Sequence, residues 1–77
     1  PFNDIMTIRY HSVGSDPISF SLYDVTGKEI THRTINSQIK DHLNQITISA
    51  DGFPAGIIIV KIEQGSNVRI LKSVHLP

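Results

Sequence analysis

Short runs of alternating apolar and polar residues divide the chain, and glycine or proline residues stand between most of them. The clearest run is Ile18 to Tyr23, where Ile18, Phe20 and Leu22 occupy every second position. A period of two places successive side chains on opposite faces of a β-strand. Similar runs recur about every ten residues, the spacing typical of small antiparallel sandwiches. No long amphipathic helical pattern competes with this interpretation.

The predicted fold is a single all-β domain over residues 1–77, a small antiparallel immunoglobulin-like β-sandwich of about six or seven strands. The expected strands are 5–10, 18–23, 29–34, 45–49, 57–62 and about 68–76. Between Ile35 and Leu43 we expect a loop with one short irregular strand, although the spacing of four in this segment also fits a short helix.

Two later strands carry more specific expectations. Apolar residues occupy both faces of Ile57–Ile62, which predicts a central strand covered on both sides. In the last strand Val68, Ile70, Val74 and Leu76 share one face, with Lys72 between them and Leu71 opposite.

Glycine and proline define the connections. Gly27 supplies the positive φ of a tight turn after the strand at 18–23, so the next strand should return antiparallel. Pro54 and Gly56 forbid a continued ladder and predict a corner, where Phe53 should close one end of the core. Gly65 marks a further hairpin.

Composition excludes several classes of function. The 77 residues contain no cysteine, so disulfides and thiolate metal sites are absent. Lys plus Arg equals Asp plus Glu at 7 each, which argues against nucleic-acid binding. The longest apolar run, Ile57–Val60, is far shorter than a membrane span, so we expect no membrane insertion. We see no signal peptide at the N-terminus and expect any export signal elsewhere.

The residues give no pattern of catalytic, metal or cofactor chemistry. The four histidines, His11, His32, His42 and His75, have spacings that match no ligand pair. The carboxylates lie mostly in expected turns, and no serine stands in a nucleophile elbow. We therefore expect neither enzyme activity nor a cofactor. Tyr10 and Tyr23 could form an exposed binding platform, but packing against the sheet is the favoured interpretation.

Four segments resemble the type A C-terminal sorting domain of the type IX secretion system. Residues 1–8 are similar to the family's opening, Ser21–Glu29 to its second motif, Pro54–Ile62 to its third, and Lys72–Leu76 to its terminal strand. The resemblance runs from Pro1 to about Leu76. The chain departs from the family pattern at Ile58, where tyrosine is usual, at Ser73, where lysine is common, and at His75, where an aliphatic residue is common.

The resemblance implies a signal that directs cargo from the periplasm across the outer membrane to the cell surface or the medium. The cargo domain would lie upstream, and a sortase-like peptidase would cut N-terminal to Pro1. Partners would be the secretion machinery and this peptidase, and we expect edge strands that could support a homodimer. The alternative is an immunoglobulin-like accessory module for carbohydrate binding or domain packing. Residues carried over as recognition candidates are Asp24, Gly27, Lys28, Pro54, Ala55, Gly56, Lys61, Lys72, Val74, His75 and Leu76.

Overall fold

The computed structural model describes residues 3–11, 16–36 and 43–76, and every regular element in these ranges is a β-strand. The strands are β1 (Ile5–His11), β2 (Ile18–Tyr23), β3 (Glu29–Ile35), β4 (Leu43–Ser49), β5 (Gly56–Gln64) and β6 (Asn67–His75). Their bounds fall within two residues of those predicted from the alternation. The predicted irregular strand falls largely on 37–42, which lie outside the described residues.

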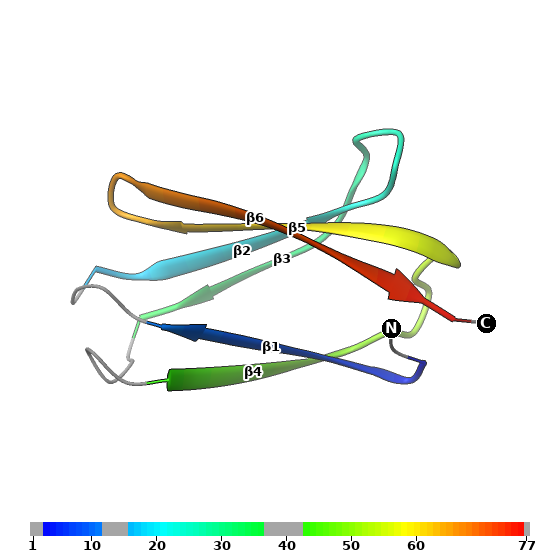
Figure 1. The fold of residues 1–77 in the computed structure, drawn as a ribbon, viewed down its shortest axis with the longest axis horizontal. Coiled ribbons are helices and arrows are strands. Elements are labelled where there is room, and N and C mark those ends of the chain that lie inside the picture. The colour runs from blue at the N-terminus through cyan, green and yellow to red at the C-terminus, as the bar shows by residue number, and fades with distance from the viewer. Residues whose placement is uncertain (1–2, 12–15, 37–42, 77) are drawn as a thin grey trace.

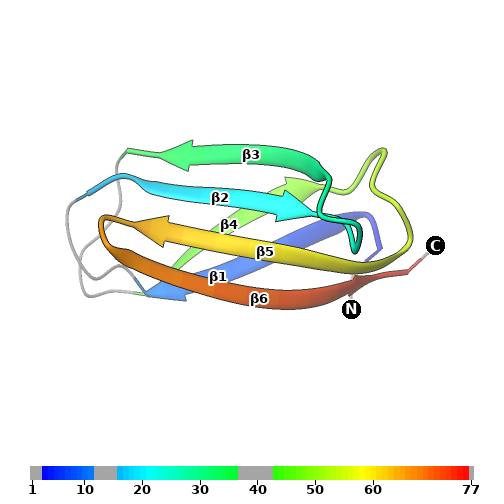
Figure 2. The ribbon, with the colours of Figure 1, turned by 90° about the horizontal axis from the view of Figure 1, so that it is seen from above.

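The strands form two layers (Figure 1). The larger sheet has the order β3-β2-β5-β6, and the smaller sheet pairs β1 with β4. All pairings are antiparallel. Seen from above, the larger sheet lies across the smaller one (Figure 2). The prediction of a small antiparallel all-β sandwich is therefore confirmed, while its immunoglobulin-like kind stays a prediction.

The core lies between the two sheets and is made by alternate residues of each strand. Phe20 and Leu22 of β2 are fully buried, and the ring of Tyr10 meets Phe20 edge-on at 5.0 Å between centroids. Tyr10 is thus a packing residue and not part of an exposed platform. Phe53 packs against the cluster from the corner, as expected. The cluster consists of Met6, Ile8, Tyr10, Ile18, Phe20, Leu22, Ile48, Ile58, Val60 and Ile62.

The prediction that both faces of β5 are covered is wrong. Ile58, Val60 and Ile62 point into the core, but Ile57 on the other face is 46% exposed. The reason is the split of the strands between the sheets: the only other sheet in the described chain, β1–β4, covers one face of the larger sheet and leaves the other, here called the outer face, open. β5 is central within its sheet, between β2 and β6, but only half-covered.

Candidate functional site

Two turns that are distant in sequence lie together at one end of the sandwich. The first is the β2–β3 turn, residues 24–28, and the second is the corner that leads into β5 together with the first two residues of that strand, residues 52–57. Val25 and Thr26 face Pro54, Ala55 and the start of β5 across an open groove of about 420 Å³. A second hollow of about 380 Å³ lies between Lys28 and Pro54, with Asp24 on the border of both. We call residues 24–28 and 52–57 the turn-and-corner surface.

The Asp24 carboxylate holds the β2–β3 turn in one conformation. Its Oδ1 accepts hydrogen bonds from the Thr26 amide at 2.9 Å, the Thr26 hydroxyl at 2.6 Å and the Lys28 amide at 3.1 Å. The amide of Gly27 donates to the Asp24 carbonyl at 3.1 Å, and Gly27 has the predicted positive φ of 88°. The Thr26 hydroxyl is the largest cause of a lowered Asp24 pKa, and the Lys28 and Thr26 amides add to it.

This pKa makes the stability of the fold depend on pH in a defined direction. The folded-state pKa of Asp24 lies below its unfolded value, so the ionised carboxylate stabilises the fold above that unfolded value. The contribution is lost as the pH falls through the folded-state pKa. We expect Thr26→Val, which removes the hydroxyl donor, to raise the Asp24 pKa and to reduce the acid sensitivity of unfolding. Carbon-detected NMR titration of Asp24 in both proteins checks this, and an unchanged Asp24 titration would contradict it.

His75 ties the end of β6 to the corner and to the start of the domain. Its Nδ1 lies 3.0 Å from the Pro54 carbonyl oxygen, and its Nε2 lies 2.9 Å from the Asn3 carbonyl oxygen. Its ring also meets Phe53 edge-on, with centroids 6.1 Å apart. The His75 side chain thus joins the end of β6 to two other segments, at a position where an aliphatic residue is common in the family that the sequence resembles.

Removal of this ring should loosen the last strand locally. We expect His75→Ala to cost about 1 kcal/mol of folding free energy, the usual net value of a hydrogen bond. Amide hydrogen exchange should accelerate mainly over residues 73–76. His11→Ala, an exposed histidine of β1, is the matched control and should leave that exchange unchanged. If the amides of β6 exchange at the same rate in the wild type, His75→Ala and His11→Ala, the His75 ring does not hold the end of β6 in place.

The other candidate residues divide into two groups. Val74 pairs with Ile57 and, with Leu76, brings the end of β6 beside the corner. Lys61 and Lys72 lie farther along the strands on the outer face, opposite Ile70 and Ile59 respectively. The structure therefore places nine of the candidates at one end of the sandwich and leaves Lys61 and Lys72 apart from them. The nine are Asp24, Gly27, Lys28, Pro54, Ala55, Gly56, Val74, His75 and Leu76.

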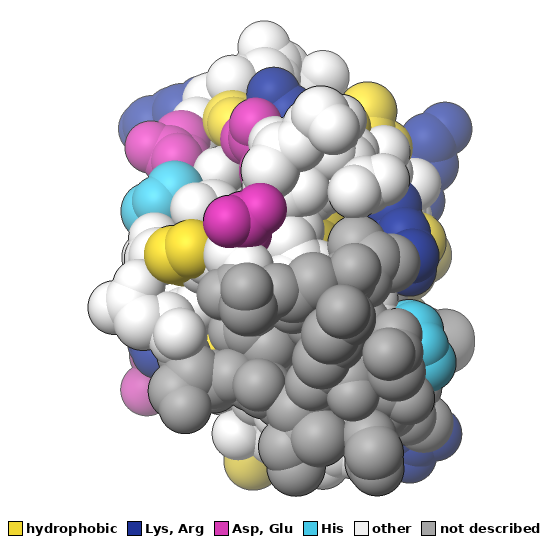
Figure 3. Space-filling model, turned by 90° about the vertical axis from the view of Figure 1, so that its left-hand side faces the viewer, with side chains coloured by type: hydrophobic (Ala, Val, Ile, Leu, Met, Phe, Trp, Pro, Cys, Tyr) yellow, Lys and Arg dark blue, Asp and Glu magenta, His cyan; other side chains and the backbone are white. Residues whose placement is uncertain are grey.

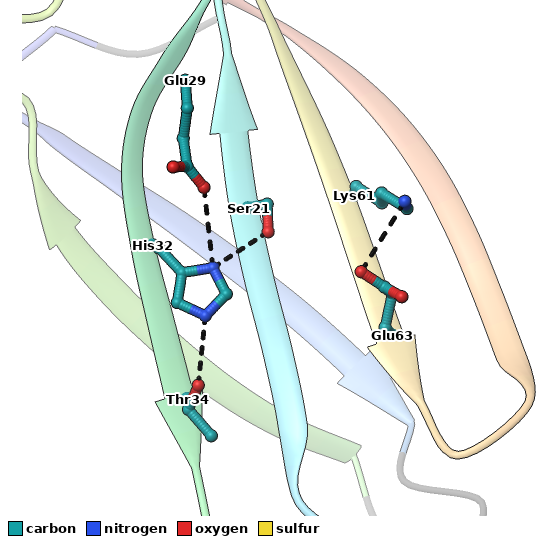
Figure 4. Close-up of polar contacts among 6 residues, drawn as sticks. All are labelled: Ser21, Glu29, His32, Thr34, Lys61 and Glu63. Atoms are coloured by element: carbon teal, nitrogen blue, oxygen red, sulfur yellow. Dashed lines mark hydrogen bonds and ion pairs between the residues drawn. The ribbon is translucent and has the colours of Figure 1, made fainter.

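A polar cluster on the outer face has some of the ingredients of a catalytic triad but not the geometry (Figure 4). His32 Nδ1 lies 3.0 Å from the Ser21 hydroxyl and 3.7 Å from Glu29, while Nε2 lies 3.3 Å from the Thr34 hydroxyl. A triad needs the serine and the acid on opposite ring nitrogens, whereas here both face Nδ1. No local sequence pattern indicates this cluster, because it depends on the β2–β3 register, which sets Ser21 opposite His32.

The rest of the described chain was compared with two further kinds of site, a metal site and a membrane span. Within residues 3–11, 16–36 and 43–76, no three His, Asp or Glu side chains gather where they could hold a metal ion. The same ranges contain no helix with the length and apolar character needed to cross a bilayer. At the opposite end of the sandwich (Figure 3), the described acidic and basic side chains are interspersed and the hydrophobic ones form small separate areas.

The fold and the turn-and-corner surface define a small all-β domain in which a hydrogen-bonded turn and a corner line one groove. Among protein families, residues 1–75 match the Secretion system C-terminal sorting domain. The chain belongs to this family, the C-terminal sorting domains of type IX secretion. No curated protein and no solved structure matches the chain. The domain is thus a signal for export across the outer membrane, and it interacts with the secretion machinery.

Proposed function

We propose that the secretion machinery recognises this domain at the turn-and-corner surface together with the end of β6. The observation that supports this most strongly is the convergence of motifs. Two of the four segments that carry the family resemblance, Ser21–Glu29 and Pro54–Ile62, are far apart in sequence, yet the turn of one and the corner of the other line one groove. His75 holds the terminal strand beside that groove. A single receptor surface could therefore contact the turn, the corner and the terminal strand at the same time.

The later steps of export belong to the same proposal. Cargo passes through the periplasm, crosses the outer membrane and is separated from the domain by a sortase-like peptidase that cuts N-terminal to Pro1. The cargo is then left at the cell surface or released. Asn3 lies against His75, so the entry to the domain is at the same end as the recognition surface (Figure 1). This arrangement supports a cut close to the bound machinery.

The proposal is tested by fusing the chain, with its upstream segment and a periplasmic export signal, to a fluorescent reporter. The fusion is expressed in a host with a working type IX system and in its translocon-deficient twin. We expect surface or medium fluorescence only in the first host. Retention of the unmodified fusion in the periplasm of both would overturn the sorting function.

A surface variant tests the recognition site itself. Val25 in the groove is 67% exposed, and Ile5 on β1 is 58% exposed, so aspartate at either position should change stability little. We expect Val25→Asp to abolish export and Ile5→Asp, the matched control, to preserve it. Normal export of both variants would show that the machinery does not recognise the groove at Val25.

Truncation tests the terminal strand. We expect deletion of residues 72–77 to abolish export, because it removes the part of β6 that pairs with residues 56–59. Normal export of the truncated fusion would remove the terminal strand from the proposal.

The alternative, an accessory module that binds carbohydrate, has lost one of its two aromatic candidates because Tyr10 is buried. Affinity electrophoresis against a polysaccharide panel separates the two functions. A sorting domain should be retarded by no polysaccharide, and retardation would favour the alternative.

A further inference from the structure

β6 is the least covered strand of the described chain. It lies at the edge of the larger sheet with only β5 beside it, and each of its residues is exposed or half-buried. On the outer face Val68 is 52%, Ile70 64% and Val74 41% exposed, and on the inner face Leu71 is 43% exposed. Edge strands usually carry devices that prevent pairing, such as short length, bulges or charged side chains, and of these three β6 has only the charges of Arg69 and Lys72. β6 is nine residues long, and its register with β5 is continuous.

The opposite edge of the same sheet, β3, differs from β6 in the packing of its apolar side chains and in the continuity of its register. In β3 the apolar residues Ile30 and Ile35 pack against the core, and the register with β2 shifts between Leu22 and Tyr23. β6 therefore combines a regular free edge with exposed apolar side chains on both faces. These are the features that strand addition uses: main-chain hydrogen bonds supply affinity and alternate side chains supply specificity.

The charges of β6 indicate which side chains a partner strand added at this edge would carry. β6 carries Arg69 and Lys72 and no acidic residue. Neither cation forms an ion pair with any residue that the structure describes, whereas Lys61 on β5 is paired with Glu63 at 3.7 Å. Arg69 is on the inner face and Lys72 on the outer face, so acids on both faces of an added strand would meet them.

We infer that β6 is a docking site for an antiparallel strand in which apolar residues accompany two acids three positions apart. Opposite residues of an antiparallel pair share a face, so the pattern follows from the order of β6. From its N-terminus the added strand runs opposite residues 74 to 68 and reads apolar, any, acidic, apolar, apolar, acidic, apolar. We assign this partner strand to a protein of the secretion machinery, and that assignment rests on the proposed function.

A second copy of the chain fits the same edge less well. Pairing β6 with itself doubles the unpaired cations along one seam and adds no acid, and like charges brought together oppose association. For the edge of β6 we therefore favour an acidic partner strand over the homodimer that edge strands could support.

The test uses the full chain and a soluble peptide with the core Val-Thr-Glu-Val-Ile-Glu-Val. A matched peptide replaces both glutamates with lysine. We expect the acidic peptide to slow amide exchange along residues 68–74 and to bind at least about tenfold more tightly than the lysine peptide at low salt. The double variant Arg69→Glu/Lys72→Glu should invert this preference. Arg9→Glu/Arg33→Glu, which reverses cations on β1 and β3, should leave it unchanged.

Three results would overturn the inference: no binding of the acidic peptide, protection of another edge instead of β6, or a concentration-dependent dimer of the free chain with β6 protected. Reporter export separates the inference from the sorting function. Normal export of Arg69→Glu/Lys72→Glu would show that the machinery does not use this edge, while the sorting function itself would fail only if the unmodified fusion is retained.

Discussion

Phe20→Ala should leave the domain largely unfolded at room temperature. Phe20 is completely buried at the centre of β2, between the two sheets. Truncation of a buried phenylalanine to alanine costs about 3–5 kcal/mol, because apolar contacts are lost and a cavity remains. A domain of this size rarely has more than about 3–5 kcal/mol of stability in total. The expected loss is therefore comparable to the whole free energy of unfolding.

Urea unfolding followed by far-UV circular dichroism measures this effect. Val25→Ala is the control, because Val25 is 67% exposed and the change should stay within about 0.5 kcal/mol. Phe20→Leu, which keeps most of the volume, should retain a cooperative transition at lower urea. A Phe20→Ala protein with the unfolding midpoint of the wild type would show that the core is not centred on this ring.

The second large effect is expected at Gly56, the first residue of β5. Gly56 has φ of +109°, a conformation that side-chain-bearing L residues rarely adopt. Apart from Gly56 and its two chain neighbours, no heavy atom of the described residues lies within 4 Å of the position that a Cβ would take, so substitution there is limited by the backbone and not by packing. We expect Gly56→Val to cost about 1–3 kcal/mol, the range of strained backbone conformations. Because Gly56 pairs with His75, the end of β6 should lose protection as well.

Chirality supplies a direct control for this prediction. The chain is short enough for chemical synthesis, so D-alanine can be placed at position 56. A D residue prefers positive φ, so this protein should be at least as stable as the wild type, while Gly56→Ala with the L residue is destabilised. Equal stability of the two alanine proteins would show that the backbone at position 56 is not strained by an L residue.

Local alternation was enough to predict the strands. Ile18, Phe20 and Leu22 are buried as their spacing indicated, and β2 has the predicted bounds. The error at Ile57 has a physical cause. The alternation of one strand shows which residues share a face, but the number of layers decides whether both faces are covered. Here the strands divide four and two, and that division depends on pairings between distant segments.

The candidate site shows the same limit. The turn at Gly27 and the corner at Gly56 could be predicted from sequence, because glycine supplies positive φ at position 27 and because Pro54 and Gly56 forbid a continued ladder. Their meeting in one groove could not, since it depends on β2 pairing with β5. The contacts of His75 with Asn3 and Pro54 join positions 72 and 21 residues apart, and no local pattern encodes them.

The placement of Asn3 and the end of β6 at one end of the sandwich also fixes how the domain responds to tension (Figure 1). A pull between these two points does not slide β6 along β5. We expect it to separate His75 from Asn3 first and then to open pairs one after another, β6 from β5 beginning at His75 and Gly56, and β1 from β4 beginning at Ile5 and Ser49. Backbone bonds that are loaded one after another resist less force than bonds loaded together. We therefore expect the domain to unfold at low force along this direction, whatever its thermodynamic stability.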